Sequence, residues 1–265
     1  MNLVEFFGTK VKPKLCRGKY MFAPLDNTHI GGGIYAMRDK DVNAFVYRKA
    51  NDVIAIDCGY KNSENMLGAL SLLNINPESV SHLFITHLDL DHAGGIDRRC
   101  RQLYKNAKIY LGNTESRYAQ GKLNRKKIGP FGLNTPIQLA DNYMVLDDGQ
   151  TQYVGSIKVQ AILIPGHTLG HLCYLVDDRY LFTGDSLILV RGKGYCFYNQ
   201  WNVDSQLNML SLQKLKNIGN VELVITSHSG YTNRIDEALS HIHEIPNWKE
   251  KGFAVSDNAP YDPYN

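Results

Sequence analysis

The chain has 265 residues, of which 43% are hydrophobic and 21% are charged, with a formal net charge of +3 at pH 7. These values are typical of globular proteins and argue against a disordered or fibrous chain. The small net charge gives no support to nucleic-acid binding, and no apolar run reaches the roughly 18 residues that a membrane-spanning helix needs. We therefore expect a single globular domain over residues 1–265.

The N-terminal region and the cysteines indicate the cellular compartment. The first twenty residues lack the continuous apolar core and cleavage site of a secretory signal. The cysteines are odd in number, widely spaced and without a Cys-x-x-Cys pair, which argues against a disulfide framework and a thiolate zinc site. We expect a cytoplasmic protein with a small-molecule substrate and no nucleic-acid or membrane partner, and a homodimer stays open.

The first elements in chain order are strands followed by a helix. Residues 34–37 and 43–48 alternate or run apolar, and an Asn-Asp turn leads into a third strand at 53–57. Apolar residues then recur at helical spacing over 62–73, which predicts a helix.

The next strand, at 82–86, ends in a run of metal-competent side chains. They lie within six residues, and they are His87, Asp89, Asp91 and His92. Alternation along an extended segment puts residues 87, 89 and 91 on one side, so an imidazole and two carboxylates converge on one point. We expect a helix over 96–104 after this loop, then a short strand at 108–111 and a further helix.

Residues 121–135 contain Gly, Pro and basic side chains with little periodicity, which predicts a surface loop. The basic residues are Lys122, Arg125, Lys126 and Lys127. Such loops often border a site, but a run of charges is more often a solvated face.

The second half repeats the mixture of strands and helices. Its pattern predicts a strand-turn-strand unit at 145–152, a long strand at 157–164 and a hairpin at 172–183. A helix at 204–215, a buried strand at 221–226 and a last helix at 235–245 follow. Two β-rich blocks that are each followed by helices predict an α+β sandwich of sheets covered by helices.

Three more metal-competent residues directly follow predicted strands in this half, which gives seven candidates in all. The complete set is His87, Asp89, Asp91, His92, His167, Asp185 and His228. Seven groups are too many for one tetrahedral ion and include too many carboxylates to stay unpaired in a cleft. We therefore expect two divalent cations close together.

Four runs of sequence, in this order, resemble the metallo-β-lactamase superfamily of hydrolases. They are Thr-His-Leu-Asp-Leu-Asp-His-Ala-Gly-Gly at 86–95, Pro-Gly-His-Thr-Leu-Gly-His at 165–171, Phe-Thr-Gly-Asp-Ser at 182–186 and Ser-His-Ser-Gly at 227–230. The resemblance covers residues 30 to 245 and implies a four-layer αβ/βα sandwich with a binuclear site at one edge. It assigns one metal to His87, position 89 and His167, a second metal to Asp91, His92 and His228, and the bridge to Asp185.

Position 89 departs from the family pattern, because most members carry His where this chain has Asp89. A carboxylate is a harder donor, which should tilt the first site from zinc toward iron or manganese. The flavodiiron oxygen reductases look similar in carrying an acid there, a Glu, but they have an extra flavin-binding domain that this chain has no room for.

The resemblance implies hydrolysis of a small-molecule ester or lactone. A water that bridges two cations is hydroxide at neutral pH and attacks the carbonyl, and Asp91 orients it and passes a proton to the leaving group. The His-Thr-x-Gly-His run is similar to that of N-acyl homoserine lactonases, although Ile188 stands where they carry Tyr. Three alternatives stay open: a phosphodiester hydrolase, a di-iron oxidoreductase or oxygen-sensing relative, and a ligand-binding relative without turnover.

Four further residues have candidate roles around the site. In the aromatic loop 192–201, Tyr195 or Tyr198 either donates a hydrogen bond to an oxyanion or packs under the loop. His171 either contacts substrate, supports the metal ligands or packs as a hydrogen-bonded histidine, and Asp57 is expected to orient a loop or a ligand rather than bind metal.

Overall fold

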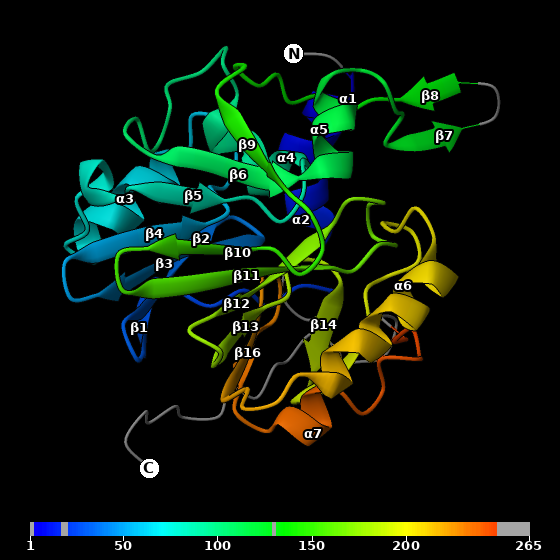
Figure 1. Cartoon of the computed structure of the whole chain (residues 1–265). Helices are drawn as coiled ribbons and strands as arrows, with labels where there is room; N and C mark the ends of the chain where they lie inside the picture. Colours follow the sequence, from blue (N-terminus) through cyan, green and yellow to red (C-terminus); the bar gives the residue numbers. More distant parts are fainter. Residues whose placement is uncertain (1–2, 17–20, 129–130, 248–265) are drawn as a thin grey trace.

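The computed structural model describes residues 3–16, 21–128 and 131–247, and two stacked β-sheets form its centre (Figure 1). The first sheet has seven strands in the order β1-β2-β3-β4-β5-β6-β9. Their bounds are Thr28–Gly31, Ile34–Asp39, Val42–Lys49, Asp52–Ile56, His82–Phe84, Lys108–Gly112 and Tyr143–Leu146. Because β4, β5, β6 and β9 run parallel, their carboxyl ends meet at one edge of the sheet.

The second sheet has six strands in the order β10-β11-β12-β13-β16-β17. Their bounds are Thr151–Val154, Ile157–Leu163, Leu172–Val176, Tyr180–Phe182, Leu223–Thr226 and Gly230–Thr232. The predicted strand-turn-strand unit at 145–152 therefore passes from one sheet to the other, since β9 and β10 lie in different sheets. Strands β13 and β16 are parallel neighbours, so their carboxyl ends also share an edge.

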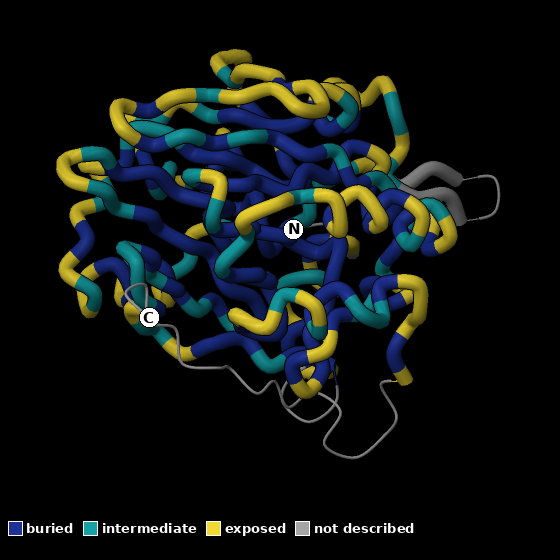
Figure 2. Tube along the Cα trace, turned by 60° about the horizontal axis from the view of Figure 1, so that its bottom comes forward, coloured by how far each residue is buried: buried dark blue, intermediate teal, exposed yellow. Residues whose placement is uncertain are grey.

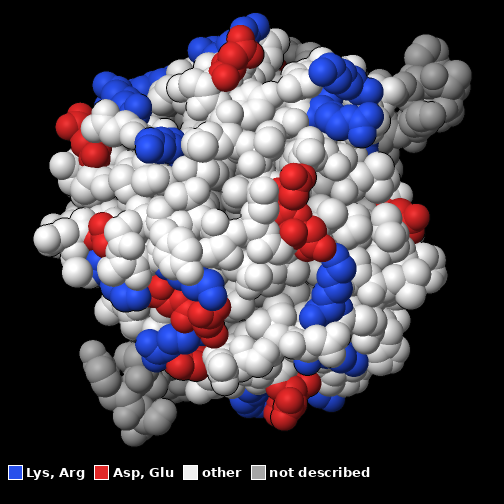
Figure 3. Space-filling model, viewed as in Figure 1, with Lys and Arg blue, Asp and Glu red and all other residues white. Residues whose placement is uncertain are grey.

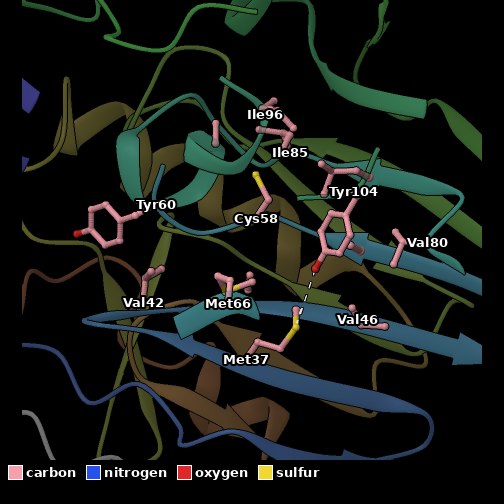
Figure 4. Close-up of a cluster of buried hydrophobic side chains, with 14 of the residues drawn as sticks. Met37, Val42, Val46, Cys58, Tyr60, Met66, Val80, Ile85, Ile96 and Tyr104 are labelled. Atoms are coloured by element: carbon pink, nitrogen blue, oxygen red, sulfur yellow. Dashed lines mark hydrogen bonds between the residues drawn. The ribbon is translucent and has the colours of Figure 1, made fainter. Parts of the chain in front are cut away.

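Alternating side chains on the strands explain the layers. On β3, Phe45 and Tyr47 belong to the core between the two sheets, whereas Ala44 and Val46 belong to the core on the other face, together with Met66 of helix α3 (Glu64–Leu72). Figure 4 shows part of this outer core, where the Tyr104 hydroxyl donates to the Met37 sulfur at 3.9 Å.

The second sheet alternates in the same way. Its strand β12 turns Leu172 and Tyr174 toward the first sheet, and turns Cys173 and Leu175 toward the core that also contains Leu212 of helix α6 (Ser205–Leu212). Helix α7 (Ile235–Ala238) covers the same face (Figure 1). The order is thus helix, sheet, sheet, helix, which confirms the predicted four-layer α+β sandwich, and buried residues fill its interior (Figure 2).

The remaining elements surround the sheet edges. The N-terminal helical segment is built from α1, η1 and α2, at Leu3–Phe6, Phe7–Val11 and Lys12–Leu15. The other short helices are η2, α4, η3, α5 and η4, at Pro77–Ser79, Leu90–Ala93, Gly94–Ile96, Asn113–Ala119 and Gln213–Asn217. No helix of the described residues combines the length and apolarity needed to cross a membrane, and basic and acidic side chains are interspersed on the face in Figure 3.

Four expectations about local structure were wrong. Residues 97–104 form turns instead of a helix, because the buried Asp97 carboxylate accepts from the backbone N–H groups of Arg99 and Gln138 and holds the chain in an irregular path. The basic loop contains a hairpin, β7 (Lys126–Ile128) with β8 (Phe131–Leu133), and the aromatic loop contains β15 (Lys193–Cys196), paired with β14 (Leu187–Val190). The last helix ends at Ala238, well before residue 245.

Candidate metal centre

All seven candidate ligands lie at strand ends on one edge of the sandwich, as the sequence predicted. The first four follow β5, and two of these, Asp91 and His92, belong to the short helix α4. The other three follow β11, β13 and β16, and they are His167, Asp185 and His228. Six of the seven are buried, and Asp89 keeps 28% of its side chain exposed.

His87, Asp89 and His167 form one group, which we call the first half-site. The two imidazole Nε2 atoms lie 3.1 Å apart. The Asp89 Oδ2 atom lies 3.2 Å from His167 Nε2 and 3.6 Å from His87 Nε2. Two imidazole nitrogens and one carboxylate oxygen therefore face the same point.

Asp91, His92 and His228 form a second group, which we call the second half-site. The Asp91 Oδ2 atom lies 3.7 Å from His92 Nε2 and 3.4 Å from His228 Nε2. The Asp91 side chain is 4% exposed and both imidazoles are fully buried. This half-site thus has the same donor types as the first in a more enclosed position.

Asp185 lies between the two half-sites. Its Oδ1 is 3.2 Å from His92 Nε2, and its Oδ2 is 3.2 Å from His228 Nε2 and 3.6 Å from His167 Nε2. One carboxylate therefore contacts histidines of both groups. Its backbone N–H donates to His171 Nε2 at 3.0 Å, so His171 supports the position of Asp185, which was one of the roles left open by the sequence.

The hydrogen bonding of these groups fits divalent cations. Although His92 Nε2 and His228 Nε2 each lie 3.2 Å from an oxygen of Asp185, these contacts lack hydrogen-bond geometry. Among the described residues, His92 Nε2, His228 Nε2 and Asp185 Oδ1 are buried without a hydrogen bond. Buried polar atoms are nearly always satisfied, and imidazole nitrogens with carboxylate oxygens are ligands that zinc accepts. His87, His167 and Asp185 form one set of possible metal ligands, and Asp91, His92 and His228 form another.

Asp57 orients two of the histidines, as expected. It follows β4 with a left-handed backbone (φ 59°), which turns its carboxylate toward the ligand loop. Its Oδ2 accepts from His92 Nδ1 at 2.8 Å, which leaves Nε2 of that ring facing the centre. Its Oδ1 accepts from the Thr86 backbone N–H at 2.8 Å, and the Thr86 hydroxyl lies 2.9 Å from His87 Nδ1.

Three other supporting contacts were missed from the sequence. His228 Nδ1 donates to the Asp41 carbonyl oxygen at 2.5 Å, and His167 Nδ1 lies 3.2 Å from Asn202 Oδ1. Buried Glu115 accepts from the Leu88 backbone N–H at 2.8 Å and also from the Thr168 hydroxyl, so it joins two ligand loops. These partners are distant in sequence and belong to no motif, so no local signal points to them.

Arg125 of the basic loop reaches the first half-site. Its Nε donates to Asp89 Oδ1 and its Nη2 donates to Asp89 Oδ2, both at 2.8 Å, and its side chain is 12% exposed. Burial alone raises the pKa of Asp89, but Arg125 and hydrogen bonds from the two histidines hold that pKa well below its usual range. The reading of the charge run as a solvated face is thus wrong for Arg125, while the side chains of Lys126 and Lys127 lie outside the described part.

Lys12 of the N-terminal helical segment reaches the second half-site. Its ammonium group contacts Asp91, lies 3.8 Å from Asp41 Oδ2 and is within 5.6 Å of the centroids of the Phe22 and Trp201 rings. Burial lowers the pKa of Lys12, but the nearby carboxylates, led by Asp91, outweigh burial and raise that pKa above its usual value. Each half-site therefore has one basic side chain on its aspartate.

The two tyrosines expected to contact substrate have other partners. The Tyr198 hydroxyl donates to the Met21 carbonyl oxygen at 2.9 Å, and the Tyr195 ring packs on His241 at 5.0 Å. This geometry favours the packing interpretation of both. The indole Nε1 of Trp201, in contrast, is buried without a hydrogen-bond partner among the described residues, and this ring lies beside Lys12.

Comparisons with known proteins agree with this geometry. A family model described as "Metallo-beta-lactamase superfamily" matches residues 37–228. The chain is 29% identical over 149 residues to a probable polyketide biosynthesis zinc-dependent hydrolase, BaeB, of Bacillus velezensis, covering 56% of this chain and 55% of that protein. It is also 29% identical over 132 residues to a probable polyketide biosynthesis zinc-dependent hydrolase, PksB, of Bacillus subtilis, covering 50% of this chain and 48% of that protein. The matches thus span about half the length of these curated relatives.

A solved structure shows the same fold. It is a B3 metallo-beta-lactamase described as the first with an active-site glutamic acid, and it superposes with a TM-score of 0.60 at 18% identity. The superposition covers 83% of this chain and 86% of that one.

Proposed function

Because the chain belongs to the metallo-beta-lactamase superfamily, we propose that it is a zinc-dependent hydrolase with two metal ions, acting on a small-molecule carboxylic ester or lactone. The names of BaeB and PksB support zinc and hydrolysis. The choice of an ester or lactone as substrate follows from the resemblance of the His-Thr-x-Gly-His run to that of N-acyl homoserine lactonases. Iron or manganese stays an alternative to zinc for the two metals.

The single observation that carries this proposal is the position of Asp185. Its carboxylate oxygens lie within 3.6 Å of histidines from both half-sites. A shared carboxylate between two sets of imidazoles is what a pair of cations close together requires. In this proposal His87, Asp89 and His167 hold one ion, Asp91, His92 and His228 hold the other, and Asp185 contacts both.

When bound, the two ions would supply a strong nucleophile from water at neutral pH and would polarise the carbonyl of the substrate. The chain's own groups position the reactants. Asp91 is kept ionised by Lys12, with a pKa held well below the usual value despite burial, so it accepts a hydrogen bond from the attacking water and orients it. The unpaired indole N–H of Trp201 is the donor we assign to the substrate.

In this proposal, substrate reaches the centre from the side of the first half-site. Asp89 is 28% exposed, whereas Asp91 and both histidines of the second half-site are at most 4% exposed because the N-terminal helical segment covers them. Arg125 donates to the Trp201 carbonyl oxygen at 3.3 Å, so these two residues lie side by side next to Asp89. Substrate therefore approaches past Arg125 and Trp201 in this proposal.

Metal analysis of protein purified without added metal, combined with a substrate panel, tests the proposal. We expect about two zinc ions per chain and turnover of aryl esters or lactones that is lost on chelation and restored by zinc. Two irons with redox activity and no ester turnover would favour the di-iron alternative. Turnover confined to phosphodiesters would favour the phosphodiesterase.

A further inference from the structure

We propose that Arg125 is a metal-selectivity residue, which holds both oxygens of Asp89 and thereby restricts this carboxylate to a single donor atom in the first half-site. The inference rests on the metal centre of the proposed function. It concerns which divalent ion the half-site selects rather than which substrate is cleaved.

The contact between Arg125 and Asp89 is a two-pronged ion pair. Nε meets Oδ1 and Nη2 meets Oδ2, both at 2.8 Å, which is the parallel geometry in which a guanidinium matches a carboxylate. Only Oδ2 is also near the imidazoles, at 3.2 Å from His167 Nε2 and 3.6 Å from His87 Nε2. The carboxylate therefore presents one oxygen, Oδ2, to the half-site, while Arg125 holds both oxygens and keeps Oδ1 turned away from the imidazoles.

Arg125 is itself fixed by contacts besides Asp89. Its Nη2 donates to the Trp201 carbonyl oxygen and lies near His167 Nε2, each at 3.3 Å. Its side chain is 12% exposed, so the guanidinium is largely removed from water. A planar group held from three directions keeps its orientation, which a flexible ammonium at this position could not do.

The number of donor atoms links this contact to metal choice. His87, His167 and Asp185 form one set of possible ligands, and Asp89 Oδ2 lies beside both of its imidazoles. One oxygen from Asp89 would therefore bring the half-site to four donors. Zinc favours four ligands in a tetrahedral arrangement, whereas manganese and iron accept more oxygen donors. Freeing the second oxygen of Asp89 would add a fifth donor, so loss of Arg125 should favour manganese over zinc.

A competition between zinc and manganese separates this effect from simple charge. Metal-free full-length protein is equilibrated with both ions at buffered free concentrations, and the bound ratio is measured by elemental analysis. Both ions carry the same charge, so the Coulomb effect of removing a guanidinium largely cancels in the ratio. We expect Arg125→Met to lower the bound zinc-to-manganese ratio by about tenfold, within the range seen when an outer partner of a ligand is removed.

Three further variants complete the experiment. Arg125→Lys keeps the charge but loses the two-pronged ion pair, so it should also lower the bound zinc-to-manganese ratio. It tests the proposal even where Arg125→Met does not fold. Lys122→Met removes an exposed charge from the same loop and should leave the ratio unchanged. In an Asp89→His background, which has no carboxylate to restrict, Arg125→Met should have no effect.

An unchanged ratio in both Arg125 variants overturns the proposal, and so does an equal shift in Lys122→Met or in the Asp89→His background. The outcome is separable from that of the proposed function. A protein that shows the predicted shift but hydrolyses nothing supports the selectivity role and contradicts the hydrolase. Wild-type protein that binds neither ion contradicts both.

Discussion

The two half-sites use the same kinds of ligand in different surroundings. The first is partly open, and a planar guanidinium holds both oxygens of its aspartate. The second is covered by the N-terminal helical segment, and a single ammonium group contacts its aspartate. The outer nitrogens differ as well: His92 donates to the charged Asp57 carboxylate, whereas His167 faces the neutral amide of Asn202.

This difference indicates a division of roles. Hydrogen bonds to charged acceptors are stronger than those to neutral ones, so His92 is held more firmly than His167. The first half-site lies on the accessible side and carries the selectivity contact of Arg125. We therefore expect variants to affect the two halves unequally, except where the shared Asp185 is changed.

Replacing Asp185 should have the largest effect, because this change acts on both half-sites. We expect Asp185→Ala to lower both metal content and the rate of hydrolysis. Each loss should exceed the roughly 10- to 100-fold that is typical when a group hydrogen-bonded to a metal ligand is removed. Elemental analysis and steady-state kinetics measure the two losses. Asp178→Asn is the matched control, since Asp178 is 52% exposed and pairs with Lys158 at the surface. Full metal content in Asp185→Ala would contradict the shared role.

Replacing Asp57 should weaken the second half-site more than the first, because Asp57 contacts His92 directly and His87 only through Thr86. We expect Asp57→Asn to reduce affinity for one of two ions by about 10- to 100-fold, because His92 loses its charged acceptor. Titration of metal-free protein by calorimetry resolves the two binding events. Asn202→Ala removes the neutral acceptor of His167 and should reduce affinity less. Equal losses in the two variants would remove the proposed difference in rigidity.

Replacing Lys12 should strengthen metal binding, whereas the two preceding replacements should weaken it. Its ammonium competes with a cation for Asp91, so we expect Lys12→Met to bind the second ion more tightly, by about tenfold, which corresponds to roughly 1.4 kcal/mol. Lys14→Met, at an exposed position of the same segment, should leave the affinity unchanged. Weaker binding in Lys12→Met would show that the ammonium orients Asp91 and does not compete with the metal.

The anchor of the N-terminal helical segment should make a smaller, pH-dependent contribution. Lys61 bridges Asp97 at 2.7 Å and Glu5 at 2.5 Å. Burial alone raises the pKa of Asp97, but hydrogen bonds from Arg99 and Lys61 hold that pKa below its usual value. A lowered pKa in the folded state stabilises the protein above pH of about 4, and this stabilisation is lost as the pH falls below that value.

Urea unfolding of metal-free protein at pH 7 and pH 3.5 measures this contribution. Wild type should lose on the order of 1 kcal/mol more stability than Asp97→Asn between these pH values, a modest figure because Arg99 is 41% exposed. The same loss in both proteins would exclude Asp97 as the titrating group.

The sequence predicted the ligands better than their partners, for a physical reason. The ligands lie in the loops, and in the short helix α4, that follow strands, so a local pattern places them at the sheet edge. Arg125 lies 36 residues from Asp89 and Lys12 lies 79 residues from Asp91, and only the folded chain brings these pairs together. The wrong helix at 96–104 has a similar origin, because the contact of Asp97 with the distant backbone N–H of Gln138 fixes the chain there.

Anomalous diffraction at the zinc edge, on crystals grown with zinc, tests the central claim most directly. The account predicts two peaks about 3.5–4 Å apart. One peak should be bounded by His87 and His167, the other by His92 and His228, with Asp185 between them. A single peak, or two peaks that do not share Asp185, would contradict a binuclear centre built from these two half-sites.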